Sequence, residues 1–269
     1  MTTDRSTTFR RLHESGCFVI PNPWNVGSAR GLARLGFSAL ATTSSGYAWS
    51  LGRPDHRASL DDALNYFRAV AESVDVPVNA DFEGGFAVDP GGVAANVARA
   101  AQTGIAGLSI EDSTGDPSNP LYDFGLAVER IKSARRAIND TKTGVLLTGR
   151  SEGFIAGRPD LAETIRRLRA YAEAGAECLF APGIQKPEEI AAVVKAVAPK
   201  PVNVIVWSSF ATVDQLAALG VRRISVGGAL ARAAWTGFLS AAREIREHGT
   251  FDALGRAITG AEMNKFFGD

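Results

Sequence analysis

Two acidic residues, Asp81 and Glu83, stand at the end of an apolar segment in the stretch PVNADFEGGF, residues 77–86. They are two positions apart, so in an extended strand both side chains point to the same side. A third acid, Glu111, ends the next apolar segment along the chain. Carboxylates at the ends of buried strands are costly unless a cation or a basic side chain compensates them. An all-oxygen set suits Mg²⁺ or Mn²⁺ better than zinc, so these acids form a candidate metal site; arginine pairing or helix capping is the alternative.

A basic residue and a hydroxyl-rich turn follow two other apolar segments. Arg150 ends VLLTGR, residues 145–150, and its planar guanidinium could either clamp a substrate carboxylate or form an ion pair with the acids. The stretch TTSSGYA, residues 42–48, offers hydroxyls and backbone N–H groups around Gly46, which suit a carboxylate or an oxyanion. Asp112 follows Glu111 directly and therefore points to the opposite face, where pairing with a basic group is expected.

Three other features give weaker signals. SVGGAL, residues 225–230, is similar to the phosphate cradle after the last strand of many barrels, but close helix packing also needs glycines. Lys186 follows an apolar run and could form a Schiff base, but its polar neighbours do not favour a buried amine. The histidines His13, His56 and His248 fall in expected helices or loops, so we do not expect them to compete for a metal.

The elements that must position these groups alternate regularly. Short β-rich runs are separated by Ala-, Leu- and Arg-rich segments of helical spacing, with caps such as Asp160 and Thr212 before them and Gly104, Gly175 and Gly220 after them. Eight strands alternating with helices predict a (β/α)₈ barrel, in which the strand ends carry the site. A doubly wound open sheet is the alternative, but no G-x-G-x-x-G follows the first strand. The expected strands are 17–23, 39–45, 76–83, 107–112, 144–150, 178–183, 201–207 and 222–228.

Composition limits the class of protein. A chain of 269 residues can form one such barrel, so we expect a single domain over 1–269 with a helical tail at 233–269. The formal net charge of +0 gives no support to a nucleic-acid or membrane partner. The polar N-terminus, the lack of a run of about 18 apolar residues and the two isolated cysteines predict a reduced, cytoplasmic protein.

Six segments in a fixed order resemble one family of enzymes. The chain is similar to the isocitrate lyase/phosphoenolpyruvate mutase superfamily from about residue 21 to residue 235. The resemblance implies a Mg²⁺-dependent (β/α)₈ enzyme that makes or breaks C–C or P–C bonds beside a 2-oxo or 2-hydroxy carboxylate, through an enolate held on the metal. It also implies a homotetramer, built as a dimer of dimers that exchange their last helix. The segments are SSGYAWSLGRPD, NADFEGG, SIEDSTG, LLTGRSEGF, YAEAGAECLFAPG and VGGALARAAW.

The resemblance also assigns roles to single residues. It implies that Asp81 binds the metal most directly and that Glu83 and Glu111 reach it through water. Arg150 matches the arginine that binds the substrate carboxylate. The further residues carried over are Ser44, Ser45, Gly46 and Tyr47 in the substrate loop, Asp55 near the reacting carbon, Asn119 as a catalytic candidate, and Asn203 facing the substrate.

One departure from the family affects the expected reaction. Isocitrate and methylisocitrate lyases carry a Lys-Lys-Cys-Gly segment after the fourth strand, and residues 110–132 here contain no cysteine, paired lysines or histidine. We therefore expect a lyase or decarboxylase acting on a small 2-oxo or 2-hydroxy dicarboxylate, either oxaloacetate-decarboxylase-like or methylisocitrate-lyase-like, rather than an isocitrate lyase. A phosphonopyruvate hydrolase or mutase is the alternative, and a non-catalytic barrel that serves as a binding subunit is the second.

Overall fold

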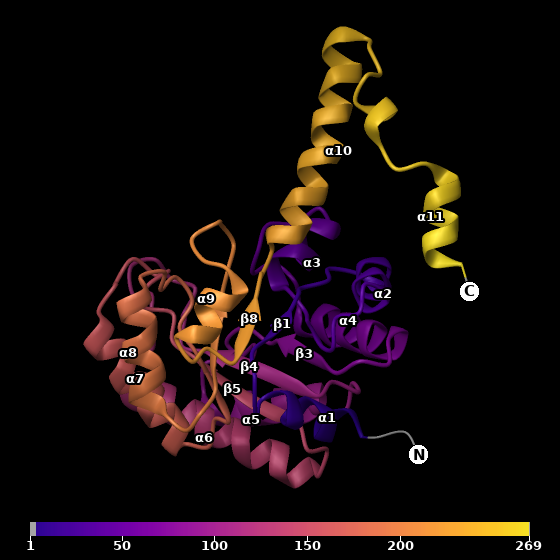
Figure 1. Cartoon of the computed structure of the whole chain (residues 1–269). Helices are drawn as coiled ribbons and strands as arrows, with labels where there is room; N and C mark the ends of the chain where they lie inside the picture. The colour runs from indigo at the N-terminus through magenta and orange to yellow at the C-terminus, as the bar shows by residue number, and fades with distance from the viewer. Residues whose placement is uncertain (1–3, 269) are drawn as a thin grey trace.

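The computed structural model describes residues 4–268, and its centre is a sheet of eight parallel strands (Figure 1). The sheet order is β1-β8-β7-β6-β5-β4-β3-β2, as a barrel requires. The ends of the sheet meet where the Ala41 N–H donates to Pro21 O over 3.0 Å. The predicted (β/α)₈ barrel is therefore confirmed. The strands are β1 (Phe18–Ile20), β2 (Leu40–Ala41), β3 (Val78–Asp81), β4 (Gly107–Glu111), β5 (Leu146–Arg150), β6 (Cys178–Phe180), β7 (Val202–Ile205) and β8 (Arg223–Ser225).

Helices alternate with the strands and begin at the expected polar caps. The Asp160 side chain accepts the Glu163 N–H, and the Thr212 side chain accepts the Gln215 N–H in a capping box. The helices are α1 (Arg5–Leu12), α2 (Val26–Arg34), α3 (Ser44–Ser50), α4 (Leu60–Ser73), α5 (Pro90–Ala101), α6 (Phe124–Thr141), α7 (Leu161–Glu173), α8 (Pro187–Val197), α9 (Val213–Ala218), α10 (Ala229–His248) and α11 (Gly260–Phe267), with a 3₁₀ turn at Leu254–Arg256.

The register of the strands aligns the residues that could do chemistry. Asp81 pairs with Ser109 across β3 and β4, and Glu111 pairs with Arg150 across β4 and β5. All three charged residues end their strands, so they lie together at the carboxyl end of the barrel. The opposite end is closed by α1, whose buried Phe9 packs so close to Gly107 that a Cβ there would lie 2.6 Å from the ring.

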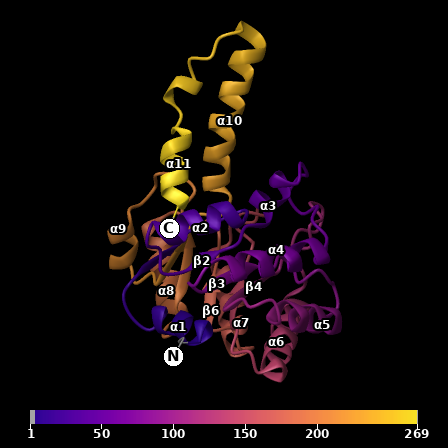
Figure 2. The same ribbon diagram turned by 90° about the vertical axis from the view of Figure 1, so that its right-hand side faces the viewer.

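Helices α10 and α11 form an arm that leaves the barrel. Figures 1 and 2 show that α10 leaves the barrel at the end opposite α1. The chain then turns back, so that α11 approaches α2. Of the twenty residues of α10, Ala231 is the one that is buried. Among residues 4–268, no helix is long and apolar enough to cross a membrane.

Candidate active site

Arg150 is the centre of a charged cluster at the carboxyl ends of β3, β4 and β5. Its Nη1 donates to Asp81 Oδ1 over 3.2 Å and lies 3.2 Å from Glu111 Oε2. Its Nε donates to Glu152 Oε1 on the segment that follows β5. The structure thus brings together Arg150, Asp81 and Glu111 as expected, and it pairs the arginine with both acids.

The charges in this cluster do not balance. Burial raises the pKa of Glu111 well above its usual value, and the neighbouring Glu152 and Asp81 carboxylates raise it further against the effect of Arg150. Burial also raises the pKa of Glu152, and the positive charge of Arg150 acts in the opposite direction and lowers it. Burial alone would lower the pKa of Arg150, but Glu152, Glu111 and Asp81 together hold it above its ordinary value. One guanidinium therefore faces three acids, of which Glu111 and Glu152 are buried, so a further positive charge beside them would be stabilised.

Glu152 was not predicted from the sequence, although its spacing gave a signal. It lies two residues after Arg150 and is buried, so it shares the side of the chain that faces the cluster. Asp112 holds this segment in place, because its Oδ1 accepts the Glu152 N–H over 2.8 Å. The other oxygen of Asp112 is held by Tyr171 over 2.6 Å and by Arg167 over 3.1 Å. The expectation that Asp112 pairs on the face opposite Glu111 is therefore confirmed.

Glu83 lies at the rim of the site, in an outer cavity of about 600 Å³ that Glu111 and Asp55 also line. The backbone of Glu83 has a φ of 47°, which lets the chain turn out of β3. His56 Nδ1 is 3.2 Å from Glu83 Oε2, and this hydrogen bond, helped by Asp55, raises the pKa of His56 to about 9. From the sequence, His56 was expected in a helix or loop and without a role at the metal site. The structure places it against Glu83, one of the expected metal ligands.

The hydroxyl-rich segment that follows β2 forms the first turn of α3. The Ser44 N–H donates to Asp81 Oδ2 over 3.1 Å, which links this helix to the acid cluster. The Gly46 N–H is 3.4 Å from Thr43 Oγ1, the N-cap of the helix, and the Ser45 hydroxyl is 3.1 Å from the same oxygen. A Cβ at Gly46 would lie 2.7 Å from Thr43 Cγ2 and 2.9 Å from Trp24 Cβ. Gly46 is therefore required by close packing, whatever its N–H binds.

Tyr47, Asn203 and Asn119 are placed differently from one another. Tyr47 is half-buried, stacks on Tyr66 with ring centroids 4.2 Å apart and donates to Asp62 O over 3.2 Å, so its ring faces α4. Asn203 lies inside the barrel and lines a small central cavity together with Asp81 and Arg150. Asn119 is exposed in the loop between β4 and α6, where Thr114 binds its carbonyl over 2.6 Å, and it lines neither of these cavities.

The weaker alternatives have structural explanations. The N–H groups of Val226 and Gly227 both donate to Asn22 Oδ1, over 2.9 and 2.8 Å, so they do not form an open phosphate cradle. A Cβ at Gly228 would lie 2.7 Å from Ser45 Oγ, so close helix packing accounts for that glycine. Lys186 is exposed, pairs with Glu189 over 3.2 Å and lines neither cavity, so it lacks the burial that would activate its amine.

The acids fit a divalent cation by their chemistry. Among residues 4–268, no three His, Cys, Asp or Glu side chains stand ready around a single point, because Arg150 occupies the space between Asp81 and Glu111 and Glu83 faces His56. The donor set is nevertheless all carboxylate, as Mg²⁺ and Mn²⁺ prefer. Asp81, Glu111 and Glu152 share one guanidinium, so their negative charges are not fully compensated. A cation here would compensate them.

Comparison with known proteins gives consistent relationships over most of the chain. The family described as phosphoenolpyruvate phosphomutase matches residues 9–246. An uncharacterized protein of Mycobacterium tuberculosis is 33% identical over 259 residues, covering 95% of this chain and 94% of that protein. A crystal structure from Burkholderia cenocepacia, described as that of a lyase/mutase, is 47% identical with a TM-score of 0.95, covering 98% of this chain and 96% of its own.

Relatives with named activities match at lower identity or over less of the chain. The 2-methylisocitrate lyase of Escherichia coli is 34% identical over 155 residues, which is 55% of this chain and 51% of that enzyme. The oxaloacetate decarboxylase of Paraburkholderia xenovorans is 28% identical and covers 73% of this chain and 67% of its own. A phosphonopyruvate hydrolase solved with oxalate and Mg²⁺ has a TM-score of 0.86 at 25% identity, covering 98% of this chain and 95% of its own.

Proposed function

Because this chain belongs to the isocitrate lyase/phosphoenolpyruvate mutase superfamily, we propose that it is a Mg²⁺-dependent lyase or decarboxylase acting on a small 2-oxo or 2-hydroxy dicarboxylate. The observation that supports this proposal is the cluster in which Arg150 meets Asp81, Glu111 and Glu152 at the carboxyl ends of three adjacent strands. This is the end of a (β/α)₈ barrel that carries the active site.

Each group in the cluster has a chemical task in this proposal. Arg150 binds a substrate carboxylate with its planar guanidinium. The first turn of α3 lies near Arg150, because the Ser44 N–H and Arg150 both donate to Asp81. Asp81, with Glu83 and Glu111, would hold the cation, which would polarise the substrate carbonyl as a Lewis acid. Arg150 also stabilises negative charge that develops on the substrate, beside the buried Glu111 and Glu152, where such stabilisation is strong.

Decarboxylation demands less of this site than aldol-type cleavage. In oxaloacetate the C–C bond to the departing carboxylate breaks and CO₂ leaves. The electron pair of that bond forms the enolate of pyruvate, which water can protonate. Cleavage of isocitrate also needs a base for the hydroxyl and an acid for the departing carbanion. The loop between β4 and α6 carries no cysteine, and its Asn119 side chain is exposed away from both cavities. The site is thus better suited to decarboxylating a 3-carboxy-2-oxo acid.

We expect the purified protein to decarboxylate oxaloacetate or a substituted relative in the presence of Mg²⁺, and to lose that activity when the metal is chelated. Pyruvate release, corrected for the metal-catalysed background, measures the reaction. Isocitrate should release no glyoxylate at an ordinary enzymatic rate, about 1 s⁻¹. Lys186→Ala is a matched control, because it should leave the activity unchanged if no Schiff base forms.

Parallel substrates separate the alternatives. Phosphonopyruvate is included because the chain superposes on a phosphonopyruvate hydrolase over 98% of its length. Release of phosphate from it without decarboxylation of oxaloacetate would replace the leading proposal with P–C bond cleavage. Binding of oxalate without turnover of any 2-oxo acid would favour a non-catalytic binding subunit.

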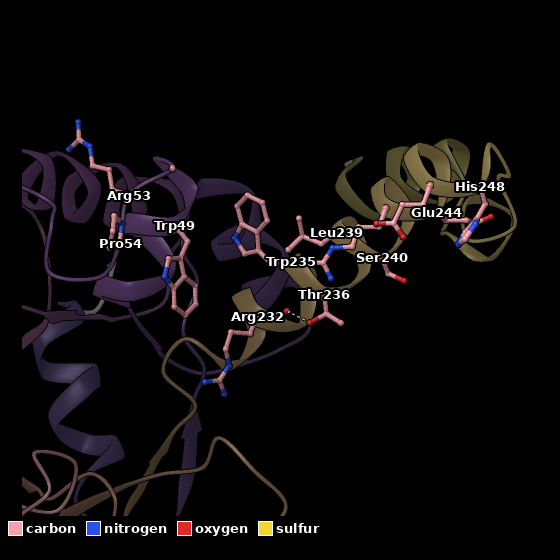
Figure 3. Close-up of a pocket in the computed structure, with 13 residues that line it drawn as sticks. Trp49, Arg53, Pro54, Arg232, Trp235, Thr236, Leu239, Ser240, Glu244 and His248 are labelled. Carbon is pink, nitrogen blue, oxygen red and sulfur yellow. Dashed lines mark hydrogen bonds between the residues drawn. The ribbon is translucent and has the colours of Figure 1, made fainter.

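The arm formed by α10 and α11 supports a homotetramer built from helix-exchanging dimers. Helix α10 and α3 enclose a groove of about 1030 Å³ that Trp49, Trp235 and Leu239 line (Figure 3). A contiguous apolar surface on an isolated helix favours association, because the helix gains little stability without packing. Large apolar side chains are exposed along the arm, namely Phe238, Leu239, Ile245, Phe251, Leu254, Ile258, Met263 and Phe267.

Light scattering should give a particle of four times the 28.4 kDa chain mass. Phe238→Asp should reduce that mass, because it places a charge on the apolar face of the arm. Val213→Asp is the matched control, since Val213 is exposed to 45% on α9 and away from the arm. A monomeric wild-type protein, or an equal loss of mass in both variants, would refute the assembly.

A further inference from the structure

Arg223 carries a buried positive charge that no acidic side chain of residues 4–268 balances with an ion pair. It begins β8, points into the barrel and is 3% exposed. Its Nε donates to Asn203 Oδ1 over 2.8 Å and its Nη2 donates to Thr148 Oγ1 over 3.1 Å. Both acceptors are neutral, so they satisfy hydrogen bonds without compensating the charge.

The third partner of Arg223 is also neutral. Arg223 Nη1 is 3.4 Å from His13 Nε2, while His13 Nδ1 is 2.7 Å from Phe9 O. A carbonyl can only accept, so Nδ1 carries the proton and Nε2 is free to accept from the arginine. Burial, followed by the nearby Arg223, lowers the pKa of His13 to about 3, which agrees with a neutral ring. Among residues 4–268, no carboxylate forms an ion pair with Arg223.

Arg223 lines the central cavity, whose volume is about 50 Å³. A space of about 10–15 Å³ by this measure holds one water, so the cavity can hold a small ion with its hydration. The lining is polar: Ser225 accepts from Asn203 over 2.9 Å, which leaves its hydroxyl hydrogen free to donate. A guanidinium has five N–H groups, and three are engaged as described, so two remain for a ligand.

Asp81 lines the same cavity, and its negative charge would repel an anion. Both of its oxygens, however, already accept hydrogen bonds from other groups. Oδ1 accepts from Arg150 and Oδ2 accepts from the Ser44 N–H. The end of the cavity near Asp81 therefore suits a cation or a bound carboxylate held by Arg150. The end near Arg223 suits negative charge, because it holds a guanidinium without an acid.

We propose that the barrel interior contains a second ligand site, in which Arg223 binds a small monovalent anion of halide size beneath the Arg150 cluster. The anion provides the counter-charge that residues 4–268 do not place beside Arg223, and it stabilises the folded barrel without taking part in the reaction. The anion site lies at the Arg223 end of the central cavity, whereas Arg150 and Asp81 line that cavity at the carboxyl ends of their strands. It does not depend on the proposed function.

Crystals of the wild-type protein soaked in sodium bromide test the site directly. We expect an anomalous bromine peak within hydrogen-bond distance of Arg223 Nη1 or Nη2, both without substrate and with oxalate bound. In solution, replacing sodium gluconate by sodium bromide at equal ionic strength should raise the Tm by about 3 °C.

Two variants distinguish Arg223 from general salt effects. Arg223→Met should lose both the bromine peak and the Tm rise, if it folds. Arg222→Met is the matched control, because Arg222 is the adjacent arginine and reaches outwards to Gly16 O over 2.5 Å, so it should keep both responses.

Either of two results overturns the proposal. The first is a wild-type crystal with water at Arg223 and no anomalous peak, which needs no variant to fold. The second is a bromide that oxalate displaces, since Arg223 would then belong to the substrate site.

Discussion

Asp81→Asn is expected to weaken Mg²⁺ binding by at least about 100-fold and to remove any metal-dependent turnover, while the fold survives. The amide keeps the shape of the side chain, and its oxygen can still accept the Ser44 N–H. It cannot provide the negative charge that a divalent cation requires. Arg150 keeps Glu111 and Glu152 as partners, so the arginine is not left unpaired. Titration calorimetry with MgCl₂ in the presence of oxalate measures the loss.

Asp61→Asn is the control for removing one negative charge. Asp61 lies on α4, pairs with Arg99 over 2.6 Å at the surface and lines neither cavity. It should leave the Mg²⁺ affinity unchanged and shift the Tm little, because surface ion pairs contribute little. Unchanged Mg²⁺ affinity in Asp81→Asn would mean that the acids serve only as partners of Arg150.

The meeting of Asp81, Glu111 and Arg150 could be predicted because it depends only on strand ends. Each residue closes an apolar segment, and parallel strands bring their carboxyl ends to one edge. Alternation also placed Asp112 on the opposite face from Glu111, where Tyr171 and Arg167 hold it. Period and position along a strand are local properties, so the sequence carries them.

The residues that were missed lie where no periodic pattern reaches. Glu152 follows β5 and is turned inwards by the hydrogen bond from its N–H to Asp112. His56 stands in a loop with a φ of 59°, and its approach to Glu83 depends on the path of the whole segment between α3 and α4. Arg223 begins a strand, where a basic residue is expected to be exposed to solvent. Its side chain nevertheless reaches across the barrel to Thr148. Such contacts arise from tertiary structure alone.

Arg150→Lys is expected to weaken oxalate binding by about 1.5–3 kcal/mol, the usual contribution of a charged hydrogen bond. Turnover of the best 2-oxo acid should fall by about 100-fold, since each tenfold corresponds to about 1.4 kcal/mol of transition-state stabilisation. Lysine keeps the charge, but its ammonium cannot reach Asp81, Glu111 and Glu152 with the planar geometry that the guanidinium provides. Calorimetry with oxalate and Mg²⁺, together with steady-state kinetics, measures both effects.

Arg167→Lys is the control for an effect of Arg150→Lys that comes only from lost stability. Arg167 is a buried arginine that, like Arg150, holds a buried acid, in this case Asp112, and it lines neither cavity. Its replacement should lower the Tm, because breaking a buried pair is costly, and should change the oxalate affinity by less than about twofold. If Arg150→Lys behaves in the same way, with a lower Tm and unchanged oxalate affinity, Arg150 is an ion-pair partner of the acids. A loss of oxalate affinity confined to Arg150→Lys identifies the guanidinium as the group that holds the substrate carboxylate.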